Sequence, residues 1–268
     1  MIADLALVSG AALVTAAVVM TLAALRARQL DRVAVVDVAW GLGFVAVAVV
    51  STAVGIAAEG DGPRRWLVLV MVGAWGLRLA WHIRRRALGA HAGKEDPRYE
   101  QLLGGPLHEV GLGLAVRKVF LVQGFAVWLI SLPIQVGAVS DVAAWPVVVL
   151  GVVVWAVGLV FESVGDAQLS AYKADPDRGP VMDRGLWAWT RHPNYFGDAC
   201  IWWGVFLVGG AASGWGGLLT IVSPLAMTYF LAFATGARLL ERTMMQREGY
   251  PEYAERTSMF VPLPPKRR

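Results

Sequence analysis

The sequence predicts an all-α polytopic membrane protein with seven transmembrane helices. Hydrophobic residues make up 57% of the 268 residues and charged residues 16%, and the mean hydropathy is +0.55. A chain this apolar is not typical of a soluble domain. Apolar runs near membrane-spanning length recur along it, and no internal repeat or low-complexity segment interrupts them. We therefore expect a single integral membrane domain over residues 1–268.

Seven apolar runs define the expected spans. The first has the length of a signal peptide, but it lacks a basic n-region and carries Asp4 instead, so we expect a retained anchor. The sixth is short, and its helix is expected to begin in the membrane interface. In order, the spans are Ile2–Leu25, Val33–Ala58, Trp66–Ile83, Val119–Val139, Pro146–Leu169, Tyr195–Val208 and Trp215–Thr235.

The distribution of cations predicts the orientation of the chain. All of the 24 Lys and Arg residues except Arg64, Arg65 and Arg78 lie in the loops after odd-numbered spans or in the C-terminal tail. Because cationic loops resist translocation, we expect the N-terminus outside and the C-terminus in the cytoplasm, in a cell (inner) membrane. Anionic lipid headgroups account for the pI of about 9.5, and no nucleic acid partner is expected.

The second span carries a carboxylate, Asp37, in an otherwise apolar run. An acid there costs roughly 2.5–3.5 kcal/mol on insertion scales, so it should face the interior and have a partner or stay protonated. Arg78 and His82, four positions apart on the third span, are the expected partners. Asp37 either forms a structural ion pair or, as a neutral acid, donates a proton in a buried pocket.

The longest polar interval runs from Arg84 to Lys118 and includes Glu95, Asp96 and Tyr99. Connections of this length are commonly lids, interfacial helices or partly disordered segments. On the fourth span, Gln123 either lines a cavity or, as we expect, forms a hydrogen bond between helices. The four His residues are scattered along the chain, and no metal site is predicted.

Polar residues of the C-terminal half gather between Phe161 and Asp198. Glu162 and Asp166 lie four positions apart, so a helix places them on one face. A basic loop follows, and Pro193 stands at a favourable first position for the next helix. The polar residues of this loop and of the first turns of that helix are Lys173, Arg178, Arg184, Arg191, His192, Asn194, Tyr195 and Asp198.

Such a set of side chains can bind an anionic, hydrogen-bonding ligand such as a nucleotide cofactor, since the free amides and the dipole of a helix N-terminus favour phosphate. The alternative is structural: the cations lie at the membrane surface, and Glu162 and Asp166 form ion pairs with them. After the last span, residues 236–249 are expected to form a cytoplasmic amphipathic helix. Its Glu241 either closes the site or pairs with Arg238 or Arg242.

Several segments carry a family resemblance. In the C-terminal half, residues 146–260, they are 161–169, 185–187, 191–198 and 250–253. Through them the chain resembles the steroid 5α-reductase-like family of membrane reductases. Residues 37–44 and 95–99 resemble only its bacterial branch, to which the chain is most similar. The Arg-His-Pro-x-Tyr element at 191–195 is shared with isoprenylcysteine carboxyl methyltransferases. It therefore indicates the superfamily and does not distinguish between their cofactors.

The resemblance implies a seven-helix fold that binds NADPH from the cytoplasmic side and reduces an activated C=C bond in a lipid-like or steroid-like substrate. Asp166 and Asn194 match cofactor-binding residues of the family, and Lys173 stands where the reductases carry Arg. Asp198 replaces a Glu and Glu162 an Asn, and the latter change keeps NADH as an alternative. The expected cofactor-binding set is Glu162, Asp166, Lys173, Arg191, His192, Asn194, Tyr195, Asp198 and Glu241.

The expected chemistry needs an acid near the substrate oxygen. Steroid reductases use a Gln-Glu pair on the second span and a Tyr after it. Here Asp37 is the nearest acid on that span, and His82 and Tyr99 can supply a second donor. We therefore expect these three residues to be catalytic, with hydride reaching the β-carbon of the substrate while an acid stabilises the enolate oxygen.

Two other classes of function remain open. One is an S-adenosylmethionine-dependent membrane methyltransferase, and the other is a non-catalytic lipid-binding or assembly protein. Similar methyltransferases carry paired Glu residues after the last span, whereas here Glu241 is followed by Arg242, which favours reduction. Sterols, polyprenyl chains and unsaturated fatty acyl lipids all fit an apolar cavity that opens to the bilayer. The sequence leaves the oligomeric state open.

Overall fold

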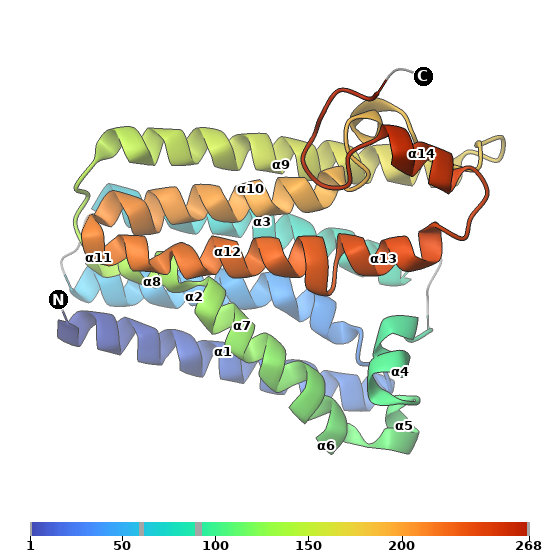
Figure 1. Cartoon of the computed structure of the whole chain (residues 1–268). Coiled ribbons are helices and arrows are strands. Elements are labelled where there is room, and N and C mark those ends of the chain that lie inside the picture. Colours follow the sequence, from blue (N-terminus) through green and yellow to red (C-terminus); the bar gives the residue numbers. More distant parts are fainter. Residues whose placement is uncertain (1, 59–61, 89–92, 267–268) are drawn as a thin grey trace. The chain divides into compact units, whose positions relative to one another are not determined.

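The computed structural model describes residues 2–58, 62–88 and 93–266. Seven helical stretches of this described part are long and apolar enough to cross a membrane, which confirms the predicted number (Figure 1). They are Ile2–Leu30, Val35–Ala57, Gly62–Leu88, Leu112–Ile130, Trp145–Ala174, Pro193–Ser213 and Trp215–Met244.

The chain folds as two compact units. The N-terminal unit comprises residues 1–147 and 208–221, and the C-terminal unit comprises residues 148–207 and 222–268. The N-terminal unit therefore contains the first four spans and the connection between the sixth and seventh. The C-terminal unit contains most of the last three spans and the tail.

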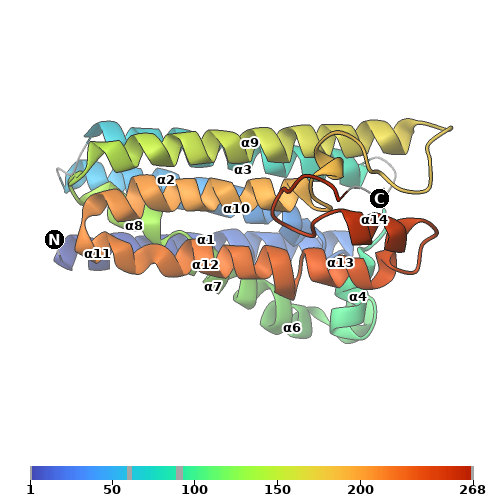
Figure 2. The same cartoon turned by 45° about the horizontal axis from the view of Figure 1, so that its top comes forward.

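In the N-terminal unit, α1 (Ile2–Leu30), α2 (Val35–Ala57) and α3 (Gly62–Leu88) pack side by side (Figures 1 and 2). The backbones of α2 and α3 touch where Gly41 faces Gly76. A Cβ atom added to Gly41 would lie 2.6 Å from the carbonyl oxygen of Gly76. Small residues at such a crossing let helices in a membrane approach closely.

The fourth span differs from the expected Val119–Val139. It begins earlier, with α6 (Leu112–Ala115) and a π-helical turn, and its continuous part ends with α7 (Leu121–Ile130). At Ser131 the chain turns into a separate helix, α8 (Leu132–Val139). Pro133 explains the break, since proline has no amide hydrogen and clashes with the preceding turn of a continuous helix.

The polar interval between α3 and α6 contains short helices, α4 (Pro97–Leu103) and α5 (Leu107–Val110). Residues 89–92 of this interval lie outside the described part of the chain. The carboxylate of Glu95 accepts hydrogen bonds from the amides of Val33 and Ala34, the latter at 3.0 Å. An acid at a helix N-terminus satisfies free amides, so Glu95 ties this interval to the start of α2.

In the C-terminal unit, α9 (Trp145–Ala174) runs along α10 (Pro193–Val205), as both cartoon views show (Figures 1 and 2). The prediction that Pro193 opens a helix is confirmed. Glycines line the contact: a Cβ atom on Gly158 would lie 2.5 Å from the Gly197 carbonyl oxygen, and one on Gly204 would lie 2.7 Å from that of Gly151. The polar residues near Gly158 and Gly197 are thereby held where the two helices touch.

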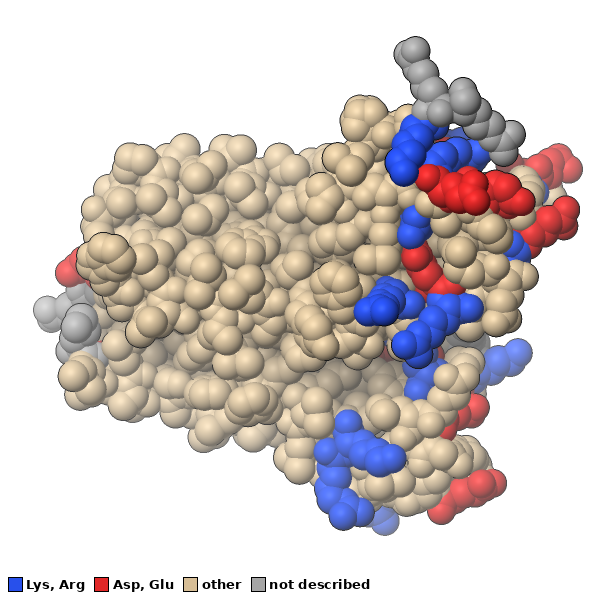
Figure 3. All heavy atoms as spheres, in the orientation of Figure 1, with Lys and Arg blue, Asp and Glu red and all other residues tan. Residues whose placement is uncertain are grey.

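The last span of this unit continues through α12 (Val222–Tyr229) into α13 (Ala237–Met244), which falls in the expected amphipathic segment, and α14 (Tyr250–Arg256) follows. The tail then pairs with the loop before α10, where the amide of Arg191 donates to Ser258 O at 2.9 Å and the hydroxyl of Tyr253 donates to Trp187 O at 2.5 Å. In Figure 3 the charged side chains of the C-terminal unit gather at the end where α9 and α13 finish.

Candidate functional site

In the N-terminal unit, α4 brings a tyrosine hydroxyl to the acid of the second span. Pro97 occupies the first position of α4, and the Asp96 side chain caps the helix by accepting from the amide of Arg98 at 2.9 Å. This start places Tyr99 in the first turn, where its hydroxyl donates to Oδ1 of Asp37. Two of the three predicted catalytic residues are therefore in direct contact.

Tyr99 is 8% exposed, and its hydroxyl has a second partner. Nε2 of Gln123, on α7, donates to the Tyr99 oxygen at 3.4 Å, so Gln123 forms the expected hydrogen bond between helices. Burial and the neighbouring Asp37 carboxylate raise the pKa of Tyr99 above its usual range. The phenol therefore stays protonated at physiological pH and holds a proton between a carboxylate and an amide.

Arg98 joins Asp37 to Asp96. Its Nε lies 3.0 Å from Oδ1 of Asp96, and its Nη2 lies 2.8 Å from Oδ2 of Asp96 and 3.2 Å from Oδ2 of Asp37. The hydrogen bonds to Asp96 raise the pKa of Arg98. Burial acts to raise the pKa of Asp96, but its hydrogen bonds with Arg98 outweigh burial and hold that pKa below its ordinary value.

The ion-pair partner that the structure gives Asp37 is thus Arg98, 61 positions away, whereas the sequence suggested Arg78 and His82. His82, the third predicted catalytic residue, is half-buried on α3. The sequence analysis counted Arg98 among the cations that predict the orientation and within the segment 95–99 that carries the resemblance, but it gave Arg98 no partner. The Asp-Pro pair before it was the available signal, because it predicts a helix start that puts Arg98 and Tyr99 on the first turn.

In the C-terminal unit, four of the predicted cofactor-binding residues lie along the contact of α9 and α10. Glu162 is 3% exposed and Asp198 is 9% exposed, so both are buried. Asp166 and Asn194 are half-buried, and Nδ2 of Asn194 donates to Oδ1 of Asp166 at 3.3 Å. A carboxylate and an amide therefore stand together at the end of α9 and the start of α10.

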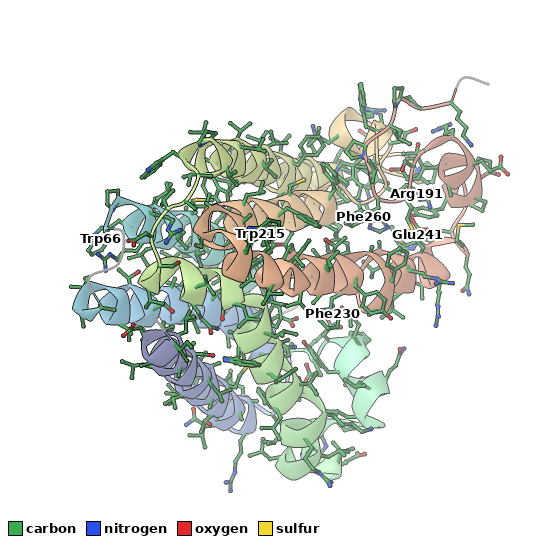
Figure 4. The ribbon with its side chains drawn as sticks, turned by 60° about the vertical axis from the view of Figure 1, so that its left-hand side comes forward. Trp66, Arg191, Trp215, Phe230, Glu241 and Phe260 are labelled. Atoms are coloured by element: carbon green, nitrogen blue, oxygen red, sulfur yellow. The ribbon has the colours of Figure 1, made fainter. Side chains whose placement is uncertain are left out.

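A second group ties α10 to α13 and to the tail. The Arg191 guanidinium forms a two-point ion pair with Glu241 (Figure 4) and donates through Nη1 to Ala254 O at 2.7 Å and Thr257 O at 2.6 Å. Nε2 of His192 lies 3.1 Å from Oε1 of Glu241. Glu241 therefore pairs across the unit, and not with its neighbours Arg238 and Arg242 as the structural alternative supposed.

The remaining predicted residues lie at the edges of these groups. The ring of Tyr195 stacks on that of His192, with centroids 5.6 Å apart and planes 5° from parallel. Lys173 is exposed in the last turn of α9. The predicted cofactor set thus divides into a half-buried carboxylate–amide pair, two buried acids, and a hydrogen-bonded cluster of Arg191, His192 and Glu241 that holds three segments together.

These observations define an integral, multi-pass helical membrane protein with polar clusters at the ends of its spans. The model of the protein family described as "protein of unknown function (DUF1295)" matches residues 9–257, and the chain belongs to this family. The family is related to the steroid 5α-reductases. No curated protein and no solved structure matched the chain.

Proposed function

We propose that the protein is a membrane-embedded, NADPH-dependent reductase of an activated C=C bond in a lipid-like or steroid-like substrate, with the cofactor bound from the cytoplasmic side. The observation that carries this proposal is the placement of Tyr99. A neutral, buried phenol hydrogen-bonded to a carboxylate and an amide is a suitable donor for a substrate carbonyl oxygen.

The residues of the C-terminal unit fit a dinucleotide. Asn194 offers an amide and Asp166 a carboxylate at a half-buried position, and these groups suit the hydroxyls and carboxamide of such a cofactor. When bound, NADPH would supply hydride to the β-carbon of the substrate. NADH remains the alternative cofactor, since Glu162 is a carboxylate where the reductases carry an amide.

The residues of the N-terminal unit supply and restore the proton. The Tyr99 hydroxyl protonates the developing enolate oxygen, and the Asp37 carboxylate then takes a proton from water and passes it to the Tyr99 phenolate, which leaves hydroxide in the solvent. The Asp37 side chain is 20% exposed, so water can reach it. Arg98, which contacts Oδ2 of Asp37, keeps Oδ1 directed at the tyrosine. Each of these groups is already in hydrogen-bond contact with the next.

The substrate class follows from the surroundings of the helices. Exposed leucine, valine and tryptophan side chains along α1, α3 and α9 contact hydrocarbon in a bilayer. A substrate of the membrane phase, such as a sterol, a polyprenyl chain or an unsaturated acyl lipid, is therefore the one available along the length of these helices. The proposed orientation, with the cations in the cytoplasm, makes a soluble cofactor available at the helix ends.

Thermal unfolding of the detergent-purified protein with NADPH, NADH or S-adenosylmethionine tests the proposal, because a ligand that binds only the folded state raises the melting temperature. We expect NADPH to raise it. A rise with S-adenosylmethionine alone would identify a methyltransferase, and no rise with any of them would favour a non-catalytic lipid-binding or assembly protein.

A further inference from the structure

The C-terminal unit contains a cavity of about 630 Å³ that none of the predicted cofactor residues lines. Its walls are Gln168, Ala171 and Tyr172 of α9, Asp175 and residues 177–185 after that helix, and Gly249 and Arg256. A volume of this size is typical of small-molecule sites.

The loop is folded back onto α9 by hydrogen bonds. The hydroxyl of Tyr172 donates to Gly179 O, and the amide of Leu186 donates to Oε1 of Gln168 at 3.0 Å. Nη1 of Arg178 lies 3.4 Å from Lys173 O at the end of α9. This cation covers terminal carbonyls whose dipole would otherwise repel an anion.

Three carboxylates line the cavity, and those of Asp175 and Asp183 accept hydrogen bonds. Nη2 of Arg256 lies 2.5 Å from Oδ2 of Asp183, and the amide of Asp177 donates to Oδ1 of Asp175 at 2.9 Å. The carboxylate of Asp177 is the exception, because no donor of the described residues contacts it. That carboxylate is suited to accept a hydrogen bond from a sugar hydroxyl.

The hydrogen-bond donors of the cavity, in contrast, are available to a ligand. Among the described residues, none accepts a hydrogen bond or forms an ion pair with the Arg184 guanidinium, which is exposed at the cavity. The backbone amides of residues 181–184 likewise make no hydrogen bond within this part of the chain. Guanidinium groups and runs of backbone amides are the donors that phosphate groups prefer.

We propose that this cavity binds the phosphorylated adenosine end of the dinucleotide, and that Arg184 makes it prefer a 2′-phosphate, hence NADPH over NADH. The inference rests on the proposed reductase function, since it assigns one end of the same cofactor. Asp177 accepts from a ribose hydroxyl, and the amides of residues 181–184 donate to phosphate oxygens.

The test is calorimetric titration of the purified protein with adenosine 2′,5′-bisphosphate and with adenosine 5′-monophosphate, neither of which carries a nicotinamide. We expect the bisphosphate to bind about tenfold more tightly, the difference expected for one added charged hydrogen bond. Arg184→Ala, and equally Arg184→Gln, should remove that advantage and leave the monophosphate unchanged. Arg242→Ala, at an exposed position of α13 outside the cavity, should change neither.

Equal binding of the two nucleotides, or bisphosphate binding that is unaffected by both Arg184 variants, would overturn the assignment of the cavity. If NADPH still raised the melting temperature in that case, the reductase proposal would stand without it. Absence of any NADPH effect would remove both. Repetition in phosphatidylglycerol and phosphatidylcholine nanodiscs separates the phosphate sources, because bisphosphate binding lost only in phosphatidylglycerol would make a lipid headgroup the occupant and overturn the proposal.

Discussion

The guanidinium of Arg191 meets the carboxylate of Glu241 at two points, with Nε 2.6 Å from Oε1 and Nη2 2.8 Å from Oε2. Both side chains are largely buried, at 11% and 13% exposure. The hydroxyl of Tyr250 lies 3.4 Å from the same carboxylate. Together with the carbonyls of Ala254 and Thr257, this pair makes one guanidinium the junction of α10, α13 and the tail.

Removal of either partner should destabilise the protein. Arg191→Ala leaves the Glu241 charge in a largely buried position, and breaking such a pair costs roughly 3–5 kcal/mol of unfolding free energy. Arg191→Lys should be intermediate, since lysine lacks the planar fork. Unfolding in detergent, followed by circular dichroism, measures the effect. Arg242→Ala is the matched control, and a loss for Arg191→Ala no larger than its own would show that the ion pair stabilises nothing.

The glycine contact between α9 and α10 predicts a second stability effect. A Cβ atom at Gly197 would lie 2.5 Å from the amide nitrogen of Glu162, so Gly197→Ala must push the helices apart. We expect a loss of about 1–3 kcal/mol. The control is Gly73→Ala on α3, where nothing lies within 4 Å and helix propensity favours alanine. Equal melting temperatures for the two variants would mean that the helices are not in backbone contact.

Cofactor binding should depend on the pair of Asn194 and Asp166. Asn194→Ala removes the amide that lies 3.3 Å from the Asp166 carboxylate, and Asp166→Ala removes the carboxylate. Either change should abolish the NADPH-dependent rise in melting temperature while the helical content stays the same. Gln246→Ala, an exposed amide on the C-terminal side of α13, is the control. Loss of folding in the Asn194 and Asp166 variants would instead assign both residues to structure.

On acidification the wild type should lose more unfolding free energy than a variant without Asp96. The pKa of Asp96 is lowered by Arg98, so the folded state binds this proton more weakly than the unfolded state. Its stabilisation is therefore complete above the ordinary value of 3.8 and is lost as pH falls from there through the folded pKa. Asp96→Asn should flatten unfolding free energy against pH in this window. Identical slopes for the two proteins would contradict the ion pair.

The sequence predicted the spans well because a bilayer imposes length and apolarity on each helix separately. The break at Ser131 was not predicted, because the sequence analysis treated the apolar run through Pro133 as one continuous helix. The expected face shared by Glu162 and Asp166 followed from helical spacing alone. The resemblance placed Asp166 and Asn194 in one cofactor set, and Pro193 predicted the helix start that carries Asn194, but the hydrogen bond between the two residues was not predicted.

Ion pairs between segments far apart in the chain could not be predicted from the sequence. Asp37 and Arg98 are 61 positions apart, and the interval before Arg98 has no apolar period that fixes its path, so spacing pointed to cations on the adjacent helix instead. The partner of Glu241 was missed for the same reason, since Arg191 is 50 positions away while Arg238 and Arg242 lie on its own helix. The cavity at residues 177–185 arises from a loop whose conformation depends on Tyr172 and Gln168, which no periodic pattern predicts.

The most direct measurement is oxidation of NADPH, followed by nicotinamide absorbance, when the protein in nanodiscs is supplied with a lipid extract of its native membrane. We predict oxidation by the wild type, loss of at least about a hundredfold in Tyr99→Phe, and an unchanged NADPH-dependent rise in melting temperature in that variant. Oxidation at the same rate in Tyr99→Phe, or no oxidation by folded wild type that binds NADPH, would contradict the account.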